Sequence, residues 1–562
     1  MSAPRMPVAR SQVAMVAFVA AVALLPAVAP PFWVTLANYI GLYTIVALGL
    51  VLLTGVAGQT SFGQAAFVGL GAYTSAWLTT AHGVSPWLAL AAGLALTFAV
   101  ALALGFVTLR MRGHFLPLAT IAWGISLFFL FGNLDFLGGH TGLAGIPALS
   151  LGGIELKDER RMCWLIWLVV LAALWTMRNL LDSRPGRAIR ALKGRLQMAE
   201  AFGVDGARLK IFIFVYAALL ACLSGWLYAH LQRFVNPTPF GINQGIEYLF
   251  MAVVGGAGSV WGAVVGATII TLLKQYLQDV LPVLLGTSGN FEVVVFGVMI
   301  ILLLQRARDG VWPWIERLLP RVAPPPVADA TPLPPRARSD FAGTLLDVRA
   351  VRKTFGGLVA VGDLSFTLAT GEIVGLIGPN GAGKSTTFAL LSGAEVPSAG
   401  DVRFCGQSIV GRAPYEIAMR GIGRTFQHVK LVAGMSVLDN VALGAHLRGR
   451  NGILRATLRL DRREEAHIRA EAARQVARCG LSAQLFAQAQ NLALGQQRIV
   501  EIARALAADP TLLLLDEPTA GMSRHEKEAL AGLLRGLRGE GMTILLVERG
   551  MEFVMGLAGR LI

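Results

Sequence analysis

The sequence predicts a polytopic α-helical membrane domain followed by an α/β domain of the P-loop class. Residues 13–305 consist mainly of long apolar runs with few charges, whereas residues 344–562 have the composition of an ordinary globular domain. Over the whole 562-residue chain, 55% of residues are hydrophobic and only 15% are charged, which is unusual for a soluble protein. A glycine-rich motif in the second region is the third observation, and it is described below.

Ten apolar runs predict the membrane domain, because a helix of about 17–25 apolar residues crosses a bilayer. The runs are residues 13–33, 35–56, 57–80, 87–107, 115–133, 162–177, 211–232, 246–258, 262–281 and 291–305. The eighth run is short and is a candidate re-entrant segment. The predicted membrane domain covers residues 13–310, and residues 1–12 form a short segment before it.

Basic residues predict the orientation of these runs, because Lys and Arg collect in loops on the cytoplasmic side of a membrane. Ten crossings place four basic clusters on one side, so both termini are predicted to be cytoplasmic. The clusters are Arg5 with Arg10, Arg110 with Arg112, the eight Lys and Arg of residues 178–210, and Arg306 with Arg308. The same rule accounts for the formal net charge of +15, and no nucleic-acid partner is predicted.

One stretch of the membrane domain mixes glycines with polar residues. Residues 55–73, GVAGQTSFGQAAFVGLGAY, include Gln59, Ser61 and Gln64. Polar side chains beside a helix break can line a solute path, and they can equally hold helices together through hydrogen bonds. The residues alone leave both interpretations open.

The stretch RPGRAIRALKGRLQMAEAFGV, residues 184–204, is long, basic and helical in pattern. A solvated basic face would explain its charges. A helix that docks on a cytoplasmic partner would explain why a compact helix ends at a glycine here. Composition does not choose between these interpretations.

Residues 311–343 are predicted to link the two domains. Their second part, PRVAPPPVADATPLPPRARSD, contains seven prolines and little apolar sequence. A proline-rich segment of this kind forms a semi-rigid spacer, so we expect it to belong to neither domain. The alternating pattern of TLLDVRAVRKTF then starts the second domain, residues 344–562.

The strongest motif is GEIVGLIGPNGAGKSTTF, residues 371–388. An apolar strand at 373–377 leads into the pattern G-x4-G-K-S and then into a helix. The glycines allow backbone N–H groups to converge on a phosphate at the helix N-terminus. Lys384 would neutralise β- and γ-phosphate oxygens, and the Ser385 hydroxyl would ligate Mg²⁺. The sequence therefore predicts a nucleotide site.

A second apolar strand, in PTLLLLDEPTAG at residues 510–521, ends in two acids. Asp516 would hold Mg²⁺, often through water, and Glu517 could polarise the attacking water for in-line phosphoryl transfer. Because this pair follows the phosphate loop by about 130 residues, as in P-loop enzymes, we interpret it as part of the same site.

Together these motifs resemble an ABC transporter. GPNGAGKST, LALGQQR and LLLLDEPTAG carry the resemblance, and KTFGGLVAV, GIGRTFQHVKLVAGMSVLDNVALGAH and EIARALAADP are similar to the ATPase subunit of branched-chain amino acid importers. In the membrane domain, TGVAGQTSFGQAAFVGLGAYTSAW, RMRGHFLPLATIAWG and AVVGGAGSVWGAVVGA are similar to permease subunits of that class. The chain thus resembles a permease fused to an α/β ABC ATPase domain.

The resemblance implies ATP and Mg²⁺ as ligands and assigns roles to individual residues. The implied nucleotide contacts are Phe355, which stacks on adenine, and Gly378, Asn380, Gly381, Ala382, Gly383, Lys384, Ser385, Thr386 and Gln427. The implied Mg²⁺ ligands are Ser385, Gln427 and Asp516, and the implied catalytic residues are Glu517 and Arg549. The implied signature motif, which contacts ATP on the opposite ATPase subunit, is Leu492, Ala493, Leu494, Gly495 and Gln496. Arg187, Arg190, Ala199, Glu200 and Gly203 match the permease loop that docks on the ATPase, so the resemblance favours the docking interpretation.

The sequence departs from the family pattern in three places. Ala493 and Leu494 stand where many ABC proteins have Ser-Gly, which removes a hydroxyl donor to the γ-phosphate. In LLVERGMEF, Arg549 occupies the place of the switch histidine and Gly550 that of an aspartate. Arginine can donate to the γ-phosphate but cannot accept a proton at neutral pH, so either hydrolysis at this site is slow or the replacement is neutral. The sequence ends at LAGRLI where the family continues, so we expect a C-terminally truncated ATPase domain.

The resemblance implies ATP-driven uptake of branched-chain or related amino acids across the inner membrane of a bacterium. The implied partners are a periplasmic substrate-binding protein, a second permease subunit, and a second ATPase subunit or a second copy of this chain. Urea and short amides are alternative substrates. The rival class is a membrane-anchored ATP-binding regulatory protein with weak hydrolysis, which Arg549 and Ala493 favour and Glu517, Gln427 and Lys384 disfavour.

Overall fold

The computed structural model describes residues 8–108, 115–285, 297–298, 301–302, 305–307, 309–318, 327, 329–336, 343–548 and 550–562. The chain divides into two compact units, of which unit 1 comprises Met1–Asn179 and Ala207–Ala323 and unit 2 comprises Leu180–Gly206 and Pro324–Ile562. The predicted domain boundary differs in one respect. Residues 180–206, which lie between two apolar runs in the sequence, belong to the same unit as the second domain.

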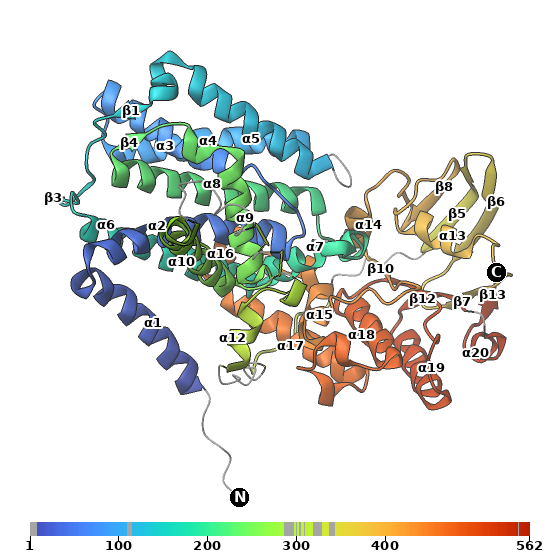
Figure 1. Ribbon diagram of the computed structural model, residues 1–562. Helices are drawn as coiled ribbons and strands as arrows, with labels where there is room; N and C mark the ends of the chain where they lie inside the picture. The colour runs from blue at the N-terminus through green and yellow to red at the C-terminus, as the bar shows by residue number, and fades with distance from the viewer. Residues whose placement is uncertain are drawn as a thin grey trace, which may run out of the picture. The chain divides into compact units, whose positions relative to one another are not determined.

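Unit 1 is built mainly from long helices (Figure 1). Its helices are α1 Val8–Val28, α2 Pro31–Leu50, α3 Gln64–Ala81, α4 Pro86–Thr108, α5 Phe115–Asn133, α6 Glu159–Leu181, α8 Gly206–Gln232, α9 Ile242–Gly256, α10 Val260–Leu285 and α12 Trp312–Leu318. Among the described residues, six stretches are long and apolar enough to cross a membrane: Pro31–Val56, Pro86–Thr108, Phe115–Asn133, Glu159–Leu181, Gly206–Gln232 and Val260–Val280. The expectation of a helical membrane domain is therefore confirmed.

The remaining four of the ten predicted segments differ from these spans. The run 57–80 is not one helix, because residues 57–63 are not helical and α3 begins only at Gln64. Gly58, with φ of +72°, ends the preceding helical turn. The first run forms α1, the eighth forms the 15-residue α9, and most of residues 291–305 lies outside the described residues.

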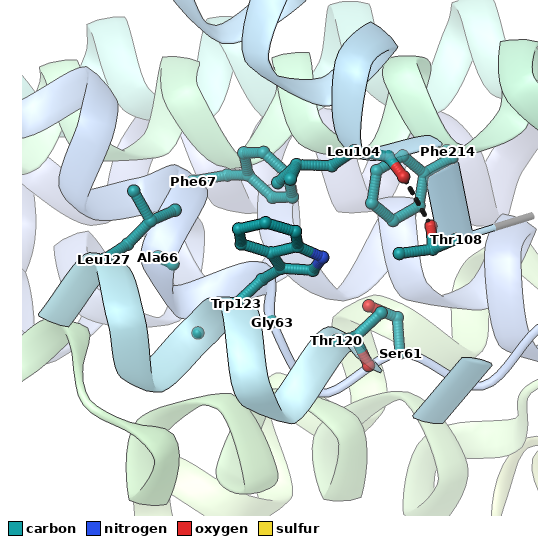
Figure 2. A pocket seen from close by; sticks show the side chains of 11 residues that line it. Ser61, Gly63, Ala66, Phe67, Leu104, Thr108, Thr120, Trp123, Leu127 and Phe214 are labelled. Atoms are coloured by element: carbon teal, nitrogen blue, oxygen red, sulfur yellow. Dashed lines mark hydrogen bonds between the residues drawn. The ribbon is translucent and has the colours of Figure 1, made fainter. Parts of the chain in front are cut away.

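Short elements complete unit 1. They are the π-helix η1 Val51–Val56, the 3-10 helices η2 Asp135–Leu137, η3 Gly139–Thr141 and η4 Thr238–Phe240, and the paired strands β1 Leu143–Ala144 with β4 Phe234–Val235 and β2 Ser150–Leu151 with β3 Ile154–Glu155. A pocket lies among the start of α3, the end of α4, the middle of α5, and α8 (Figure 2).

Unit 2 contains a parallel sheet of order β10-β11-β12-β7-β13 and an antiparallel sheet of order β6-β5-β8-β9. The strands are β5 Leu346–Phe355, β6 Leu358–Leu368, β7 Ile373–Leu376, β8 Ala399–Phe404, β9 Gln407–Ser408, β10 Ile422–Arg424, β11 Leu512–Asp516, β12 Thr543–Val547 and β13 Arg560–Leu561. Strands β7, β11 and β12 are buried along their whole length, which explains their unbroken apolar sequences.

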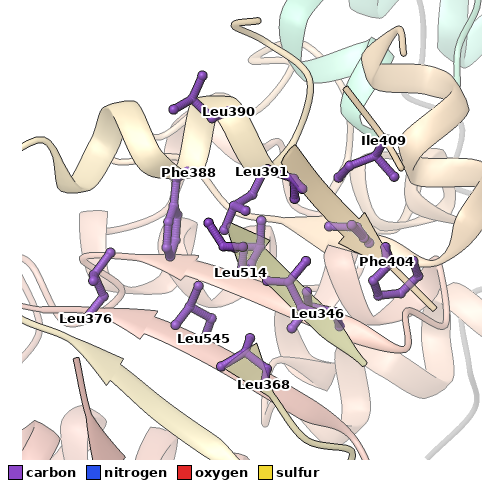
Figure 3. Close-up of a cluster of buried hydrophobic side chains, with 14 of the residues drawn as sticks. Leu346, Leu368, Leu376, Phe388, Leu390, Leu391, Phe404, Ile409, Leu514 and Leu545 are labelled. Carbon is purple, nitrogen blue, oxygen red and sulfur yellow. The ribbon is translucent and has the colours of Figure 1, made fainter. Parts of the chain in front are cut away.

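Helices cover these sheets and add a second core. They are α7 Arg184–Ala201, α13 Lys384–Leu391, α14 Pro414–Arg420, α15 Val437–Gly444, α16 Ile453–Thr457, α17 Arg462–Arg478, α18 Leu494–Ala507, α19 Arg524–Gly539 and α20 Met551–Met555, with the short 3-10 helices η5 Ala445–Arg448, η6 Ser482–Gln484 and η7 Ala489–Asn491. Figure 3 shows the main core, where Leu346 and Phe404 of the antiparallel sheet meet Leu514 and Leu545 of the parallel sheet and Phe388 of α13. A second apolar cluster joins α15, α17 and α18.

Part of the predicted linker packs on unit 2, contrary to the expectation of a spacer that belongs to neither domain. The backbone N–H of Arg336 donates to Asp509 at 2.6 Å, and the Arg448 guanidinium donates to the carbonyl oxygen of Leu333 at 3.0 Å. An extended proline-rich chain makes no internal backbone hydrogen bonds, so its carbonyl groups are free to accept from neighbouring side chains.

Candidate nucleotide-binding site

The phosphate loop and the two acids lie at one edge of the parallel sheet of unit 2. Asp516 is in register with Val547, and Val547 is in register with Leu376, so β11, β12 and β7 end side by side. The phosphate loop, residues 377–383, begins directly after β7. Ligands of open parallel sheets bind beyond the carboxyl ends of the strands, which is where these three segments meet.

The phosphate loop has the backbone of an anion-binding loop. Gly381 and Gly383 both have φ of +86°, and Gly383 is the N-cap of α13. A Cβ atom on Gly383 would lie 2.3 Å from the carbonyl oxygen of Ala360, so only glycine fits there. The Lys384 ammonium donates to the carbonyl oxygen of Gly378 at 2.6 Å. The loop thus places a cation and the helix N-terminus together.

Other residues with predicted nucleotide contacts lie in or beside this loop. Asn380, Ala382 and Ser385 belong to the loop or to the first turn of α13, and Asn380 and Ser385 are exposed. Thr386 is half-buried in the same turn. Phe355 ends β5, is 46% exposed, and has the Lys353 ammonium 4.8 Å from its ring centroid. An exposed aromatic face of this kind is free to stack on a purine.

Asp516 has the environment that a magnesium ligand needs. The residue is only 1% exposed, and its Oδ1 atom has no hydrogen-bond partner among the described residues. Burial raises the pKa of the Asp516 carboxyl, and Arg424 opposes this effect from 3.8 Å. A buried carboxylate oxygen without a partner fits Mg²⁺, which prefers oxygen ligands, and Asp516 and Ser385 would hold it. Bound there, the ion would neutralise phosphate charge.

Glu517 lies next to this acid in an unusual backbone conformation. Its φ is +47°, and its N–H donates to the carbonyl oxygen of Val547 at 2.8 Å. The amide of Gln427 donates to Glu517 Oε1 at 3.3 Å, and Arg498 donates to the carbonyl oxygen of Gln427 at 2.8 Å. A non-glycine residue in this conformation costs about 1–3 kcal/mol, so the surrounding contacts hold the carboxylate in place.

Arg549 lies outside the described residues, but the residue before it, Glu548, makes buried contacts beside the site. Glu548 follows β12 and is buried, and its Oε2 accepts from the N–H of Thr519 at 3.0 Å and from its hydroxyl at 2.7 Å. Glu548 therefore connects the segment that carries Arg549 to the segment that follows Glu517. The sequence interpretation missed Glu548, although an acid directly after a buried strand is the pattern that identified Asp516.

The signature residues lie at the start of α18, more than 100 residues after the phosphate loop in the sequence. Ala493 is the N-cap and Leu494 is 53% exposed, whereas Leu492 and Gly495 are buried and Gln496 is half-buried. A Cβ atom on Gly495 would lie 2.9 Å from Glu526 Oε1. The exposed face at Ala493 and Leu494 is free to meet another molecule.

Residues 184–203, here called the docking segment, pack within unit 2 against the helices of the second domain. Arg187 is fully buried and donates with both terminal nitrogens to Glu465 of α17, with Nη2 at 3.0 Å from Oε2. Arg184 donates to the carbonyl oxygens of His446 and Gly449, both at 2.6 Å. Burial and these two arginines lower the pKa of His446 to about 3, so its imidazole is neutral. Arg184 and Arg187 therefore bind groups of the second domain and do not form a solvated basic face.

The docking segment is two short helices rather than one. Residues 193–195 are not helical, and Gly194 has φ of +72°. The segment ends at Gly203, whose N–H donates to the carbonyl oxygen of Glu200 at 2.9 Å, and Ala199 is fully buried. A Cβ atom on Gly203 would lie 2.1 Å from Leu447.

Arg190 donates to the carbonyl oxygen of Leu181, just before the docking segment, at 2.9 Å.

The end of the docking segment contacts a buried arginine that the sequence interpretation missed. The guanidinium of Arg504 lies 4.8 Å from the ring centroid of Phe202, and both residues are almost fully buried. Arg504 also donates to the carbonyl oxygen of Lys430 at 3.0 Å and to Glu501 at 3.1 Å. Lys430 and Gln427 lie in the loop that follows β10, and Gln427 donates to Glu517. Arg504 therefore connects the docking segment to this loop.

Comparisons with known proteins match both parts of the chain. Residues 32–304 match the family "Branched-chain amino acid transport system / permease component", and residues 361–520 match the family "ABC transporter". The high-affinity branched-chain amino acid transport ATP-binding protein LivG of Escherichia coli (strain K12) is 40% identical over 220 residues, which are 39% of this chain and 86% of that protein. The corresponding protein BraF of Pseudomonas aeruginosa is 35% identical over 39% of this chain and 87% of its own length. A solved nucleotide-free ATP-binding cassette is 28% identical over 38% of this chain and 85% of its own, with a TM-score of 0.35.

The two family matches follow one another without overlap, and the ATP-binding relatives are covered over most of their length. ATP hydrolysis coupled to transport, with ATP and Mg²⁺ as ligands, is the activity of this family, and the site above has the parts for it. The chain therefore belongs to the branched-chain amino acid transport family of ABC transporters, and it carries the permease and the ATP-binding domain in one polypeptide.

Proposed function

We propose that this chain imports leucine, isoleucine and valine, or closely related aliphatic amino acids, by ATP-driven alternating access. The observation that carries the proposal is the presence in one chain of a branched-chain amino acid permease match and of an ATP-binding domain 40% identical to that of such a transporter. The complete phosphate loop, Asp516 and Glu517 support hydrolysis as the energy source.

The proposal includes partners in the inner membrane and periplasm of a bacterium. One permease domain and one ATP-binding domain are half of what an importer of this family needs. A second permease, a second ATPase subunit or copy of this chain, and a periplasmic substrate-binding protein would complete it. The exposed Ala493 and Leu494 at the start of α18 support contact with a second ATPase subunit.

Coupling would pass through the docking segment. When ATP brings two ATPase subunits together, Gln427 would move with the nucleotide site. Gln427 is tied to α18 by Arg498, and α18 is tied to Phe202 of the docking segment by Arg504. These contacts support a direct mechanical connection between ATP and the helices that flank the docking segment.

Uptake measured in proteoliposomes that contain this chain with its partner subunits tests the proposed function. We expect ATP-dependent uptake of labelled leucine that excess valine inhibits and excess urea does not. Lys384→Ala should abolish uptake, because the phosphate loop loses its cation. Lys527→Ala, an exposed lysine on α19, is the control and should leave uptake unchanged. Uptake of urea or acetamide in place of leucine would overturn the substrate assignment.

We further propose that hydrolysis at this chain's own site is slow because Arg549 replaces a histidine. Arg549→His is expected to raise steady-state ATP hydrolysis by about tenfold or more, since a correctly placed transition-state donor contributes about 10²–10³ in rate. Arg538→His, on the exposed face of α19, is the control and should have no effect. An unchanged rate in Arg549→His would identify the arginine as a neutral replacement. ATP binding without hydrolysis in both proteins, even with partner subunits, would favour the regulatory function instead.

A further inference from the structure

The described part of the proline-rich linker, residues 327 and 329–336, is here called the strap, and its side chains follow a period of three. Every third residue is half-buried against unit 2, and the other described residues of the strap are exposed. The half-buried residues are Val327, Ala330, Leu333 and Arg336. A polyproline II helix has three residues per turn, so one edge of such a helix faces the domain along the whole strap.

The second domain contacts this edge through an apolar cluster and through hydrogen bonds to the strap's backbone. Val327 and Leu333 pack against the apolar cluster that joins α15, α17 and α18. The imidazole of His467 on α17 donates from Nδ1 to the carbonyl oxygen of Thr331 at 2.7 Å. Apolar contacts at regular positions, together with donors for the backbone carbonyl groups, are how proteins recognise extended proline-rich peptides.

Arg448 binds the strap and the body of the domain with one guanidinium group. Its Nη2 atom donates to the carbonyl oxygens of Leu333 at 3.0 Å and Pro334 at 2.9 Å. Its Nη1 atom donates to the carbonyl oxygen of Ala507 at 2.9 Å and pairs with Glu471 at 3.1 Å. The side chain is only 4% exposed. Removal of the strap would take both acceptors from Nη2, and a buried charged donor without acceptors is unfavourable.

The docking segment binds the same turn of the domain as the strap. Arg184 donates to the carbonyl oxygens of His446 and Gly449, both at 2.6 Å, and Leu447 lies against the end of the docking segment. Arg448 lies between Leu447 and Gly449 in the sequence and holds the strap. Four consecutive residues of η5 and its end therefore carry the contacts to both segments.

We propose that the strap is a built-in ligand of the ATP-binding domain. It is a polyproline-type peptide on a binding surface, here called the strap site, that α17, η5 and the end of α18 form. By supplying acceptors to Arg448, the strap keeps η5 in the conformation that receives the docking segment. A simple tether needs length and no fixed contacts, whereas the three-residue period fits this chain's own linker to the strap site.

Peptide binding to the full-length chain tests the strap site. The probe is a fluorescent peptide with the sequence of residues 327–336, VADATPLPPR. Leu333→Asp should release the strap, because a carboxylate is unfavourable against an apolar cluster, so this variant should bind the peptide. Wild type should bind it about tenfold more weakly, since its own strap competes at high effective concentration. Pro335→Asp places the same charge on the exposed edge, and this control should behave as wild type.

Two further measurements show whether the peptide occupies the strap site. Adding Arg448→Lys to Leu333→Asp should weaken peptide binding about tenfold, because an ammonium group lacks the fork that serves two carbonyl oxygens. A peptide with aspartate in place of its leucine should bind to none of these proteins. Leu333→Asp that binds no peptide, or that binds it no better than wild type does, would overturn the strap site.

Transport measurements test the role of the strap at η5, and this part of the inference rests on the proposed function. Leu333→Asp should lower the leucine taken up per ATP hydrolysed about fivefold, because η5 then holds the docking segment less firmly. Peptide enclosed in proteoliposomes on the side of the ATP-binding domain should raise this ratio again. An unchanged ratio in Leu333→Asp would overturn the role at η5. Wild type that takes up no leucine would contradict the proposed function, and peptide binding would still decide the strap site.

Discussion

Replacing Glu517 with glutamine is expected to lower steady-state ATP hydrolysis by about 10²- to 10⁴-fold while ATP still binds. Glutamine keeps the shape of the side chain and an oxygen that can accept from Gln427, which lies 3.3 Å from Glu517 Oε1. An amide cannot take the proton of the attacking water, so only the chemical step is lost. Phosphate release in single-turnover and steady-state assays measures the rate, and equilibrium binding of labelled ATP measures occupancy.

Glu528→Gln is the control for this change. Glu528 is exposed on α19 and pairs with Arg524 at 3.1 Å, so the substitution alters the net charge equally without touching the site. Equal rates in wild type and Glu517→Gln would show that another group activates the water. Loss of ATP binding in Glu517→Gln would show that the carboxylate holds the nucleotide or its metal instead.

The nucleotide site was largely predictable because each of its parts is a short contiguous motif. A buried strand, a glycine-rich loop and a helix N-terminus follow one another in the sequence, and the rule for parallel sheets then places the end of β11 beside them. The contact between Glu548 and Thr519 was not predictable in the same way. The acid after β12 is visible in the sequence, but its partner Thr519 depends on where two strands end relative to each other.

The docking segment shows why composition alone left its interpretation open. Composition records that Arg187 is charged, but burial depends on Glu465, which lies 278 residues further along the chain. The bend at Gly194 and the end of the helical turn at Gly58 were missed for a related reason. Glycine permits a positive φ but does not require it, so only packing decides where a helix stops.

The bundle itself was predictable from hydropathy, but the count and continuity of its helices were only partly so. Long apolar runs identify membrane helices because the bilayer sets their length. The run 57–80 satisfies that criterion as a sequence, yet its first residues, 57–63, are not helical. The sequence does not indicate this interruption. It is seen in the structure, where the N–H of Phe62 donates to the Thr120 hydroxyl instead of to a carbonyl oxygen of the preceding helical turn.

Arg187→Glu is expected to uncouple ATP hydrolysis from uptake. Burial lowers the pKa of Arg187, but Glu465 outweighs burial and leaves that pKa above its usual value, so both groups of the pair are charged. Two facing carboxylates in this buried position should cost about 3–5 kcal/mol of the free energy that holds the docking segment. We expect uptake to fall to background while hydrolysis continues without stimulation by the proposed substrate-binding protein in its solute-loaded form. Proteoliposomes that report uptake and phosphate release together measure both.

Arg462→Glu is the control for the change in net charge. Arg462 also pairs with the segment before α7, with Asp182 at 3.4 Å, but the two side chains are 42% and 51% exposed, so the pair is worth at most about 1 kcal/mol. Uptake in Arg462→Glu should therefore stay near that of wild type. The double variant Arg187→Glu with Glu465→Arg should recover part of the uptake, the remainder being limited by Arg469, which lies 3.0 Å from Glu465. Equal losses in Arg187→Glu and Arg462→Glu would mean that net charge in this region, and not the buried pair, sets the uptake. No recovery in the double variant, whose net charge equals that of wild type, would mean that the opposite charges of the pair are not what couples ATP hydrolysis to uptake.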